Sequence, residues 1–190
     1  MDLSKYNRKR DFDSTTEPKG EIKKSKNELI FVVQKHAASH LHYDFRLEMN
    51  GVLKSWAIPK GPSMNPEEKR LAILVEDHPY VYKDFEGIIP EGNYGAGTVI
   101  VWDNGTYTLA DEHDKDEVES KLKEGLQKGH LSFILNGKKL KGEFALVKLK
   151  IKQKNAWILI KKNDEYANDA DILLKNKSVI SNSTLEELGK

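Results

Sequence analysis

The residue types best suited to chemistry are concentrated between positions 36 and 46, where the chain reads HAASHLHYDFR. Alternate residues of a β-strand face the same side, so His42, Asp44 and Arg46 share one face, with successive Cβ atoms roughly 7 Å apart. His36 precedes a short turn and could fold back to add a second imidazole. Two imidazoles and one carboxylate with open positions make a catalytic type of metal site for Mn²⁺, Zn²⁺, Fe²⁺ or Co²⁺. The adjacent Arg46 guanidinium would direct such a site toward phosphate.

These residues also permit a simpler interpretation, a solvent-facing strand that carries His and Asp without any metal. Three further positions have two interpretations each. His78 precedes Pro79 and is either a general acid or phosphate donor, or a turn residue bonded to Asp77. Tyr82 is either an active-site phenol or a packing residue. Lys60 lies in a rigid Pro-Lys-Gly-Pro loop and either contacts a substrate or is solvated.

The elements that must position these side chains are mostly short strands. Positions 41–49 alternate between apolar and polar residues, and Asn50-Gly51 is a strong signal for a two-residue hairpin turn. Asn136-Gly137 predicts another turn, and the glycine-rich segment 91–97 predicts a tight connection between strands. One amphipathic helix is predicted at 116–127, with Gly129 near its end. The predicted strands are 29–35, 41–49, 52–58, 71–76, 98–102, 105–109, 131–135, 143–150 and 156–161.

This pattern predicts a mainly β fold, a small single-domain β-barrel of about eight strands flanked by one or two helices. Residues 1–28 are polar and are expected to form an extended arm that folds over the site. Residues 29–166 form the barrel domain. Residues 167–190 form a tail, in which Ser183 or Thr184 could cap a short last helix through Leu188.

The composition of the 190 residues excludes several classes of site and location. The absence of cysteine removes disulfides, thiolate zinc sites, iron–sulfur clusters and thiol nucleophiles. No apolar run approaches the roughly 20 residues that cross a bilayer, and the first residues lack the apolar segment of a secretory signal. We therefore expect a cytoplasmic protein without a membrane partner.

The net charge of +1, from 31 basic and 30 acidic residues, gives no global sign of a polyanionic partner. The charge is segregated, however: positions 137–162 hold nine lysines and one acid, Glu143. Such a segment would suit contact with a nucleic-acid backbone, or would be a solvated face on which lysines discourage sheet aggregation.

Two long segments resemble the 3′-phosphoesterase domain of DNA ligase D, which also occurs free-standing in some archaea. They are FVVQKHAASHLHYDFRLEMNGVLKSWAIPKGPS, from position 31, and LAILVEDHPYVYKDFEGIIPEGNYGAGTVIVWDNGTY, from position 71. The similarity runs from about position 6 to 166 and includes KRDF at 9–12 and Glu17-Pro18.

The resemblance implies a β-barrel and an activity on DNA 3′ ends. A terminal ribonucleoside is removed to leave a 3′-phosphate, and the phosphate is then removed to leave a 3′-OH. Carried over by position, His36, His42 and Asp44 are the metal ligands, and Arg46, His78 and Tyr82 are catalytic. Arg46 and His78 also contact phosphate. Residues at matching positions that support activity are Lys60 and Arg70, which we assign to phosphate or substrate binding, and Arg10, Asp11, Glu17, Gln34 and Glu76.

The expected cofactor is Mn²⁺, with Co²⁺ or Zn²⁺ as substitutes. The expected substrate is a DNA primer–template with a 3′-phosphate or 3′-ribonucleotide end. Because the sequence has no ligase or polymerase segment, the partners would be a separate DNA ligase, with a polymerase or Ku. We expect a monomer. Two alternatives are a non-catalytic module that binds DNA ends and recruits a ligase or polymerase, and an enzyme for a different phosphoester.

Overall fold

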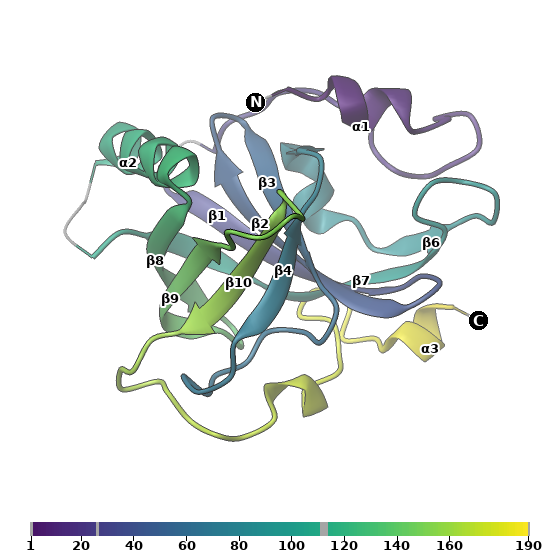
Figure 1. Cartoon of the computed structure of the whole chain (residues 1–190). Helices are drawn as coiled ribbons and strands as arrows, with labels where there is room; N and C mark the ends of the chain where they lie inside the picture. Colours follow the sequence, from purple (N-terminus) through teal and green to yellow (C-terminus); the bar gives the residue numbers. More distant parts are fainter. Residues whose placement is uncertain (1, 26, 111–113, 190) are drawn as a thin grey trace.

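Alternation of apolar and polar side chains along the strands produces a closed antiparallel β-barrel in the computed structural model, which describes residues 2–25, 27–110 and 114–189 (Figure 1). The barrel strands are β1 Leu29–Ala37, β2 Leu41–Met49, β3 Val52–Ile58, β4 Arg70–Leu74, β7 Gly97–Thr108, β8 His130–Gly137, β9 Lys141–Lys148 and β10 Ala156–Lys161. They follow the order β1-β2-β3-β4-β10-β9-β8-β7, and pairing of β7 with β1 closes the barrel. The predicted mainly β barrel of about eight strands is therefore confirmed.

Short elements surround the barrel. Strand β5, His78–Pro79, pairs with β3, and strand β6, Gly87–Ile89, pairs with β7. The predicted helix is α2, Lys115–Lys128; the Asp114 side chain accepts from two backbone N–H groups at its start, and Gly129 ends it in the left-handed conformation. Thr184 caps α3, Leu185–Leu188, in a reciprocal capping box with Glu187. The remaining elements are α1 Ser4–Arg8 and the 3₁₀ helices η1 Tyr80–Asp84 and η2 Ile172–Leu174.

The interior of the barrel is apolar and rich in aromatic side chains. Phe45 stacks on Phe133 with ring centroids 5.8 Å apart, and Trp56 meets Trp157 edge-to-face at 6.0 Å. All four side chains are almost fully buried. Burial of large rings in a closed sheet supplies most of the hydrophobic stabilisation, and it fixes which face of each strand points outward.

A second apolar cluster lies on the outside of the barrel, beneath the N-terminal arm and η1. Val32 and Val101 project outward from β1 and β7 and pack with Tyr6 of α1 and with Tyr82 of η1. The arm is therefore tied down by its own buried side chains. It also contains the short helix α1, where the sequence predicted only extended chain.

The C-terminal segment runs back across the barrel. The Trp102 indole N–H donates to the Lys175 carbonyl at 2.7 Å, and Val179 donates through its backbone to Val101 at 2.9 Å. In the described part of the chain, no helix has the length and apolar character required to span a membrane.

Two further predictions of local structure were wrong. The predicted strands 98–102 and 105–109 are one strand, β7, because β1 pairs along its whole length and the Asp103 carboxylate is satisfied by the backbone N–H groups of Lys139 and Leu140. The predicted turn at Asn136-Gly137 lies further along the chain. Asn136 still pairs with Lys141, so Lys138–Leu140 make the turn.

Candidate active site

The β1–β2 hairpin brings the three predicted metal ligands together. His36 lies directly opposite His42 in the register of the two strands, and Asp44 lies one side-chain repeat further along β2. The Asp44 Oδ2 atom is 3.7 Å from His36 Nδ1 and 3.7 Å from His42 Nε2. One ligand atom from each residue lies within 4.8 Å of the others. The cross-strand pairing thus produces the convergence that a turn before β2 was expected to allow.

Backbone carbonyls orient both imidazoles. His36 Nε2 is 2.9 Å from the Gly95 carbonyl, and His42 Nδ1 is 2.9 Å from the His40 carbonyl. Because a carbonyl oxygen can only accept, each of these nitrogens donates to it, so the other ring nitrogen of each histidine faces Asp44 and is the one that could bind a metal ion. Two imidazoles and one carboxylate are a donor set that suits Mn²⁺, Co²⁺ or Zn²⁺, so the residues fit a divalent metal ion.

Electrostatics keep Asp44 ionised. Burial alone would raise the pKa of its carboxyl, but Arg46 and then the two histidines outweigh burial and hold that pKa below its usual range. Arg46 Nη2 donates to Asp44 Oδ2 at 3.1 Å. A carboxylate that stays charged at neutral pH is the form that binds a cation.

A buried network fixes the Arg46 guanidinium. Its Nε donates to Gln34 Oε1 at 2.7 Å, and its Nη1 donates to Ser55 Oγ at 2.9 Å. Gln34 in turn donates to the carbonyls of Tyr82 and Phe85. Since a guanidinium has five N–H donors, two remain beyond the bonds to Gln34, Ser55 and Asp44 and could bind phosphoryl oxygens.

The N-terminal arm completes the site. Arg10 Nε donates to Glu17 Oε1 at 2.8 Å, and the Tyr82 hydroxyl donates to the same oxygen at 2.8 Å. The Arg10 guanidinium lies over the Tyr6 ring at 3.8 Å, and Arg10 Nη2 is 3.3 Å from His78 Nε2. The arm thus adds a second buried guanidinium to the first.

The surroundings of His78 and Tyr82 keep both side chains neutral. Burial, together with Arg46 and Arg10, lowers the pKa of His78 well below its usual value. His78 Nδ1 donates to the Glu76 carbonyl at 3.0 Å, so Nε2 is unprotonated and faces Arg10. Burial, and then Glu17, raises the pKa of the Tyr82 phenol far above its usual value, so Tyr82 remains a hydrogen-bond donor.

These groups line a pocket of about 290 Å³ on the outer face of the barrel. Glu76 lies at its edge, 3.0 Å from Lys9 Nζ and 3.6 Å from Arg10 Nη1. Lys9 also donates to the Tyr94 hydroxyl at 3.0 Å. The predicted residues that line the pocket are Arg10, His36, His42, Asp44, Arg46, Glu76, His78 and Tyr82.

Five predicted residues lie outside that lining. Gln34 and Glu17 act from behind it, through Arg46 and Arg10. Asp11 is exposed and accepts from the backbone of Asp13 and Ser14, so it shapes the loop of the arm. Lys60 and Arg70 line a different pocket, of about 460 Å³, where Arg70 is ion-paired with Glu68. The structure therefore does not bring Lys60 and Arg70 to the metal ligands.

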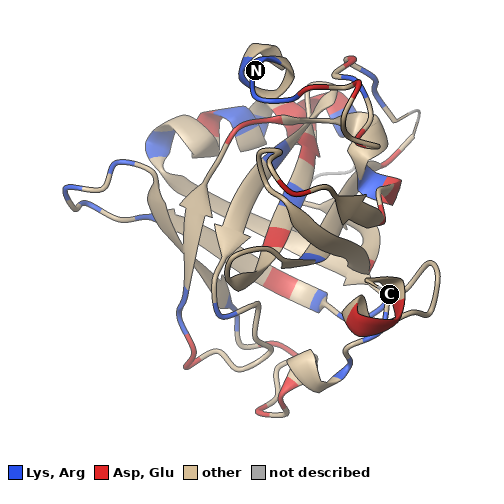
Figure 2. Cartoon of the chain, turned by 90° about the vertical axis from the view of Figure 1, so that its right-hand side faces the viewer, with Lys and Arg blue, Asp and Glu red and all other residues tan. Residues whose placement is uncertain are grey.

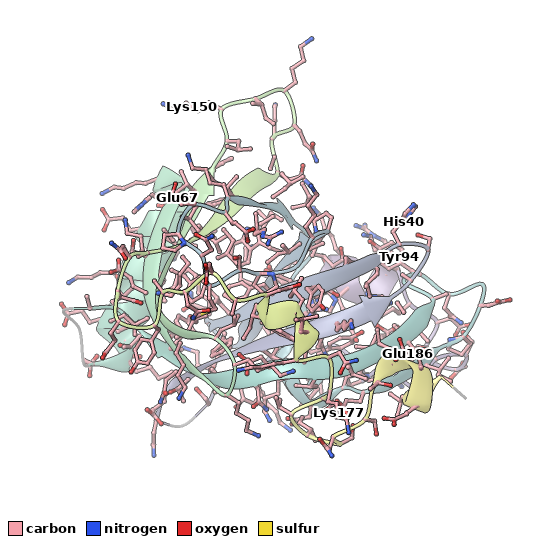
Figure 3. The ribbon with its side chains drawn as sticks, turned by 90° about the horizontal axis from the view of Figure 1, so that it is seen from below. His40, Glu67, Tyr94, Lys150, Lys177 and Glu186 are labelled. Atoms are coloured by element: carbon pink, nitrogen blue, oxygen red, sulfur yellow. The ribbon has the colours of Figure 1, made fainter. Side chains whose placement is uncertain are left out.

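Several residues at the site were missed by sequence reasoning. Ser55 and Tyr6 touch Arg46 and Arg10 but carry no motif of their own. Gly95 belongs to the glycine-rich segment, which was interpreted as a tight connection, and its carbonyl orients His36. His40 contributes its carbonyl, while its imidazole is exposed and points away from the barrel (Figure 3). Only the glycine run was a usable sequence signal.

The fold and the site together define a closed antiparallel barrel that carries a His-His-Asp cluster and two buried arginines in one outer pocket, a set of side chains that could hold a divalent ion beside an anion. The model of the DNA Ligase D 3'-phosphoesterase domain matches residues 34–148. The chain belongs to this family.

Related proteins are much longer than this chain. The multifunctional non-homologous end joining protein LigD of Pseudomonas aeruginosa is 51% identical over 190 residues, which cover 96% of this chain and 22% of that protein. The LigD of Mycobacterium tuberculosis strain H37Rv, named as a DNA repair protein, is 43% identical over 77% of this chain and 18% of its own length. The LigD of Mycolicibacterium smegmatis is 41% identical over 86% of this chain and 21% of its own length. The chain thus spans about a fifth of these relatives.

Proposed function

We propose that this protein is a metal-dependent phosphoesterase that processes DNA 3′ ends for end joining in the cytoplasm. In a first step, water adds to phosphorus, the bond to the 5′ oxygen of a terminal ribonucleoside breaks, and that oxygen takes the proton. A 3′-phosphate remains. In a second step, water adds again, the bond to the 3′ oxygen breaks, and inorganic phosphate leaves a 3′-OH.

The observation that carries this proposal is the convergence of His36, His42 and Asp44 beside Arg46 in one pocket. A divalent ion held by the three ligands, with Mn²⁺ preferred, would supply positive charge that polarises a phosphoryl oxygen. Membership of the 3′-phosphoesterase family supports the type of substrate, and the similarity to non-homologous end joining proteins supports the pathway.

The protein's own side chains bind and orient the phosphate. Arg46 offers its two remaining N–H groups from a position that Gln34 and Ser55 fix, so little reorganisation is needed as charge develops on the phosphoryl oxygens. Arg10 adds a second guanidinium, and Glu17 and Tyr82 hold it in place. His78 is neutral before substrate binds. Its Nε2 can therefore accept a proton, which favours a role as base or acceptor over that of a preformed cation.

A primer–template assay tests the proposal. Purified protein is given a 3′-phosphate end or an end with one or two ribonucleotides, with Mn²⁺, Co²⁺, Zn²⁺, Mg²⁺ or EDTA. We expect both ends to be converted with Mn²⁺, and neither with EDTA. Absence of conversion with every metal ion would contradict the proposed phosphoesterase activity. Tight binding of the ends that EDTA does not change would then support a DNA-end-binding module instead.

The products define the expected partners. A 3′-OH is the end that a separate DNA ligase or polymerase uses, and Ku is a further proposed partner at the same ends. We propose that the protein acts on DNA as a monomer. Sedimentation of the protein alone and with a primer–template measures this directly.

A further inference from the structure

Two grooves lie at opposite ends of strand β4. At the start of β4, Arg70 and Leu71 line one groove together with Lys60. Past its end, Leu74, Val75 and Glu76 line the other, of about 690 Å³. This second groove shares Val75, Glu76 and Tyr94 with the active-site pocket, so the two are continuous. A group attached to a phosphate in the pocket can therefore extend into this second groove.

The groove past the end of β4 is charge-balanced. Its lining includes three lysines and three carboxylates. Most of these charges are paired with one another: Lys54 Nζ is 2.8 Å from Asp77 Oδ1, and Lys9 Nζ is 3.0 Å from Glu76 Oε2. Without a surplus of positive charge, this groove suits a neutral polar group better than a chain of phosphates. The charged residues are Asp2, Lys5, Lys9, Lys54, Glu76 and Asp77.

The groove at the start of β4 has the opposite character. Lys60, Lys69 and Arg70 face a single carboxylate, Glu68. Within residues 2–25, 27–110 and 114–189, neither Lys60 nor Lys69 has a carboxylate at ion-pair distance. A surplus of cations is what a phosphate-bearing strand requires. The protruding loop between β9 and β10, which carries lysines and no acidic residue (Figure 2), lies at the other end of β4, where only its Asn155 lines the charge-balanced groove.

Tyr94 stands where the charge-balanced groove meets the active-site pocket. Its side chain is 49% exposed, although the ring is large and apolar. Lys9 Nζ is 4.1 Å from the ring centroid, and the Arg10 guanidinium carbon is 5.7 Å from it. An exposed ring held by two cations beside a phosphate site is a platform on which a nucleobase can stack. The neighbouring Gly95 carbonyl holds His36, so the loop also fixes the distance from platform to ligands.

We propose that Tyr94 and the charge-balanced groove bind the terminal ribonucleoside, the group that leaves in the first step of the proposed function, on which this inference rests. The phosphate-bearing strand that precedes the scissile phosphate lies on the side of Lys60, Lys69 and Arg70. Removal of the nucleoside then uses Tyr94 as a binding residue. Removal of a bare 3′-phosphate has no nucleoside to place there, so the two steps depend on Tyr94 to different degrees.

The test compares the two reactions in the same variant. With Tyr94→Leu, we expect the ratio of kcat/KM for nucleoside removal to kcat/KM for phosphate removal to fall by about tenfold or more, mainly through KM, because stacking on the base is lost. Tyr94→Phe keeps the ring and should keep the ratio within about threefold of the wild type. Tyr166→Leu is the matched control, since Tyr166 is similarly exposed, at 43%, and lines none of these grooves.

An unchanged ratio in Tyr94→Leu would overturn this inference alone, because wild-type turnover in the same assay upholds the proposed function. Wild-type failure on both ends would instead overturn the proposed function. A measurement independent of turnover uses adenosine and metal-free protein in EDTA, by saturation-transfer NMR. We expect contact signals with the wild type that Tyr94→Leu loses and Tyr166→Leu retains. Equal signals in wild type and Tyr94→Leu would contradict the subsite.

Discussion

The side chains on the two faces of strand β2 are buried by different kinds of contact. Tyr43, Phe45 and Leu47 point into the barrel and are buried by apolar neighbours, as simple alternation predicts. Asp44 and Arg46 point outward and are nearly as buried, although both are charged. The inner face is buried by strands of the same sheet, whereas the outer face is covered by the arm, η1 and the loop that carries Gly95.

The side chains on the inner face of β2 therefore serve the stability of the fold, and those on the outer face serve the chemistry of the site. An aromatic side chain inside the barrel stabilises the fold through the apolar area it removes from water. A charged side chain outside it is tolerated only because hydrogen bonds and opposite charges compensate for its desolvation. Substitutions on the inner face should therefore change the free energy of unfolding, while substitutions on the outer face should mainly change activity.

The largest expected effect is on the outer face, in His42→Ala. Loss of one ligand removes most of the metal-assisted rate, on the order of 10³-fold in kcat/KM on a 3′-phosphate end, while circular dichroism remains that of the folded protein. His40→Ala is the matched control, because only the His40 carbonyl contacts the site. Equal activity of His42→Ala and His40→Ala would refute the assigned ligands.

The next effect is on the inner face, in Phe45→Ala. Removing a ring that contacts Phe31, Trp56 and Phe133 should lower the free energy of unfolding by about 3–5 kcal/mol in urea denaturation. Phe45→Leu keeps much of the volume and should cost less. If Phe45→Leu destabilised the protein as much as Phe45→Ala, the loss would not arise from the cavity.

A smaller effect is expected in the arm, for Glu17→Gln. The change removes the charge shared by Arg10 and the Tyr82 hydroxyl, at a cost of about 1–3 kcal/mol in local stability. Hydrogen exchange of arm amides should rise, and kcat/KM should fall about tenfold or more because Arg10 is less well oriented. Glu21→Gln, an exposed change in the same arm, should do neither. Unchanged exchange in Glu17→Gln would mean that other contacts hold the arm.

The smallest expected effect is the dependence of folding stability on pH that His78 imposes. Its folded-state pKa is lowered well below 6.5, chiefly by burial, so the unfolded chain binds a proton that the folded site refuses. The contribution of His78 to the free energy of unfolding is therefore complete above pH 6.5. It declines as the pH falls below that value, because unfolding then takes up close to one proton. Urea titrations between pH 7.5 and 5.5 should show a smaller decline in His78→Gln. An identical decline in the wild type and in His78→Gln would show that other groups cause the pH dependence.

Much of the barrel could be predicted because its cause is local. The 41–49 alternation and the Asn50-Gly51 turn define the β2–β3 hairpin, and the left-handed backbone at both turn residues fits that sequence. Predictions failed where tertiary partners override local signals. Asp103 would break an isolated strand, but the backbone N–H groups of Lys139 and Leu140 satisfy its carboxylate inside β7.

The site divides in the same way. The shared face of His42, Asp44 and Arg46 follows from the two-residue repeat of a strand, so the sequence by itself determined the core of the cluster. The register of β1 against β2 decided that His36 lies opposite His42, and the arm decided that a second guanidinium meets His78. Lys60 and Arg70 lie at another groove because the barrel places the start of β4 there. A sequence specifies what one strand can present, whereas closure of the sheet and packing of the arm decide which groups meet, since those contacts join residues far apart in the chain.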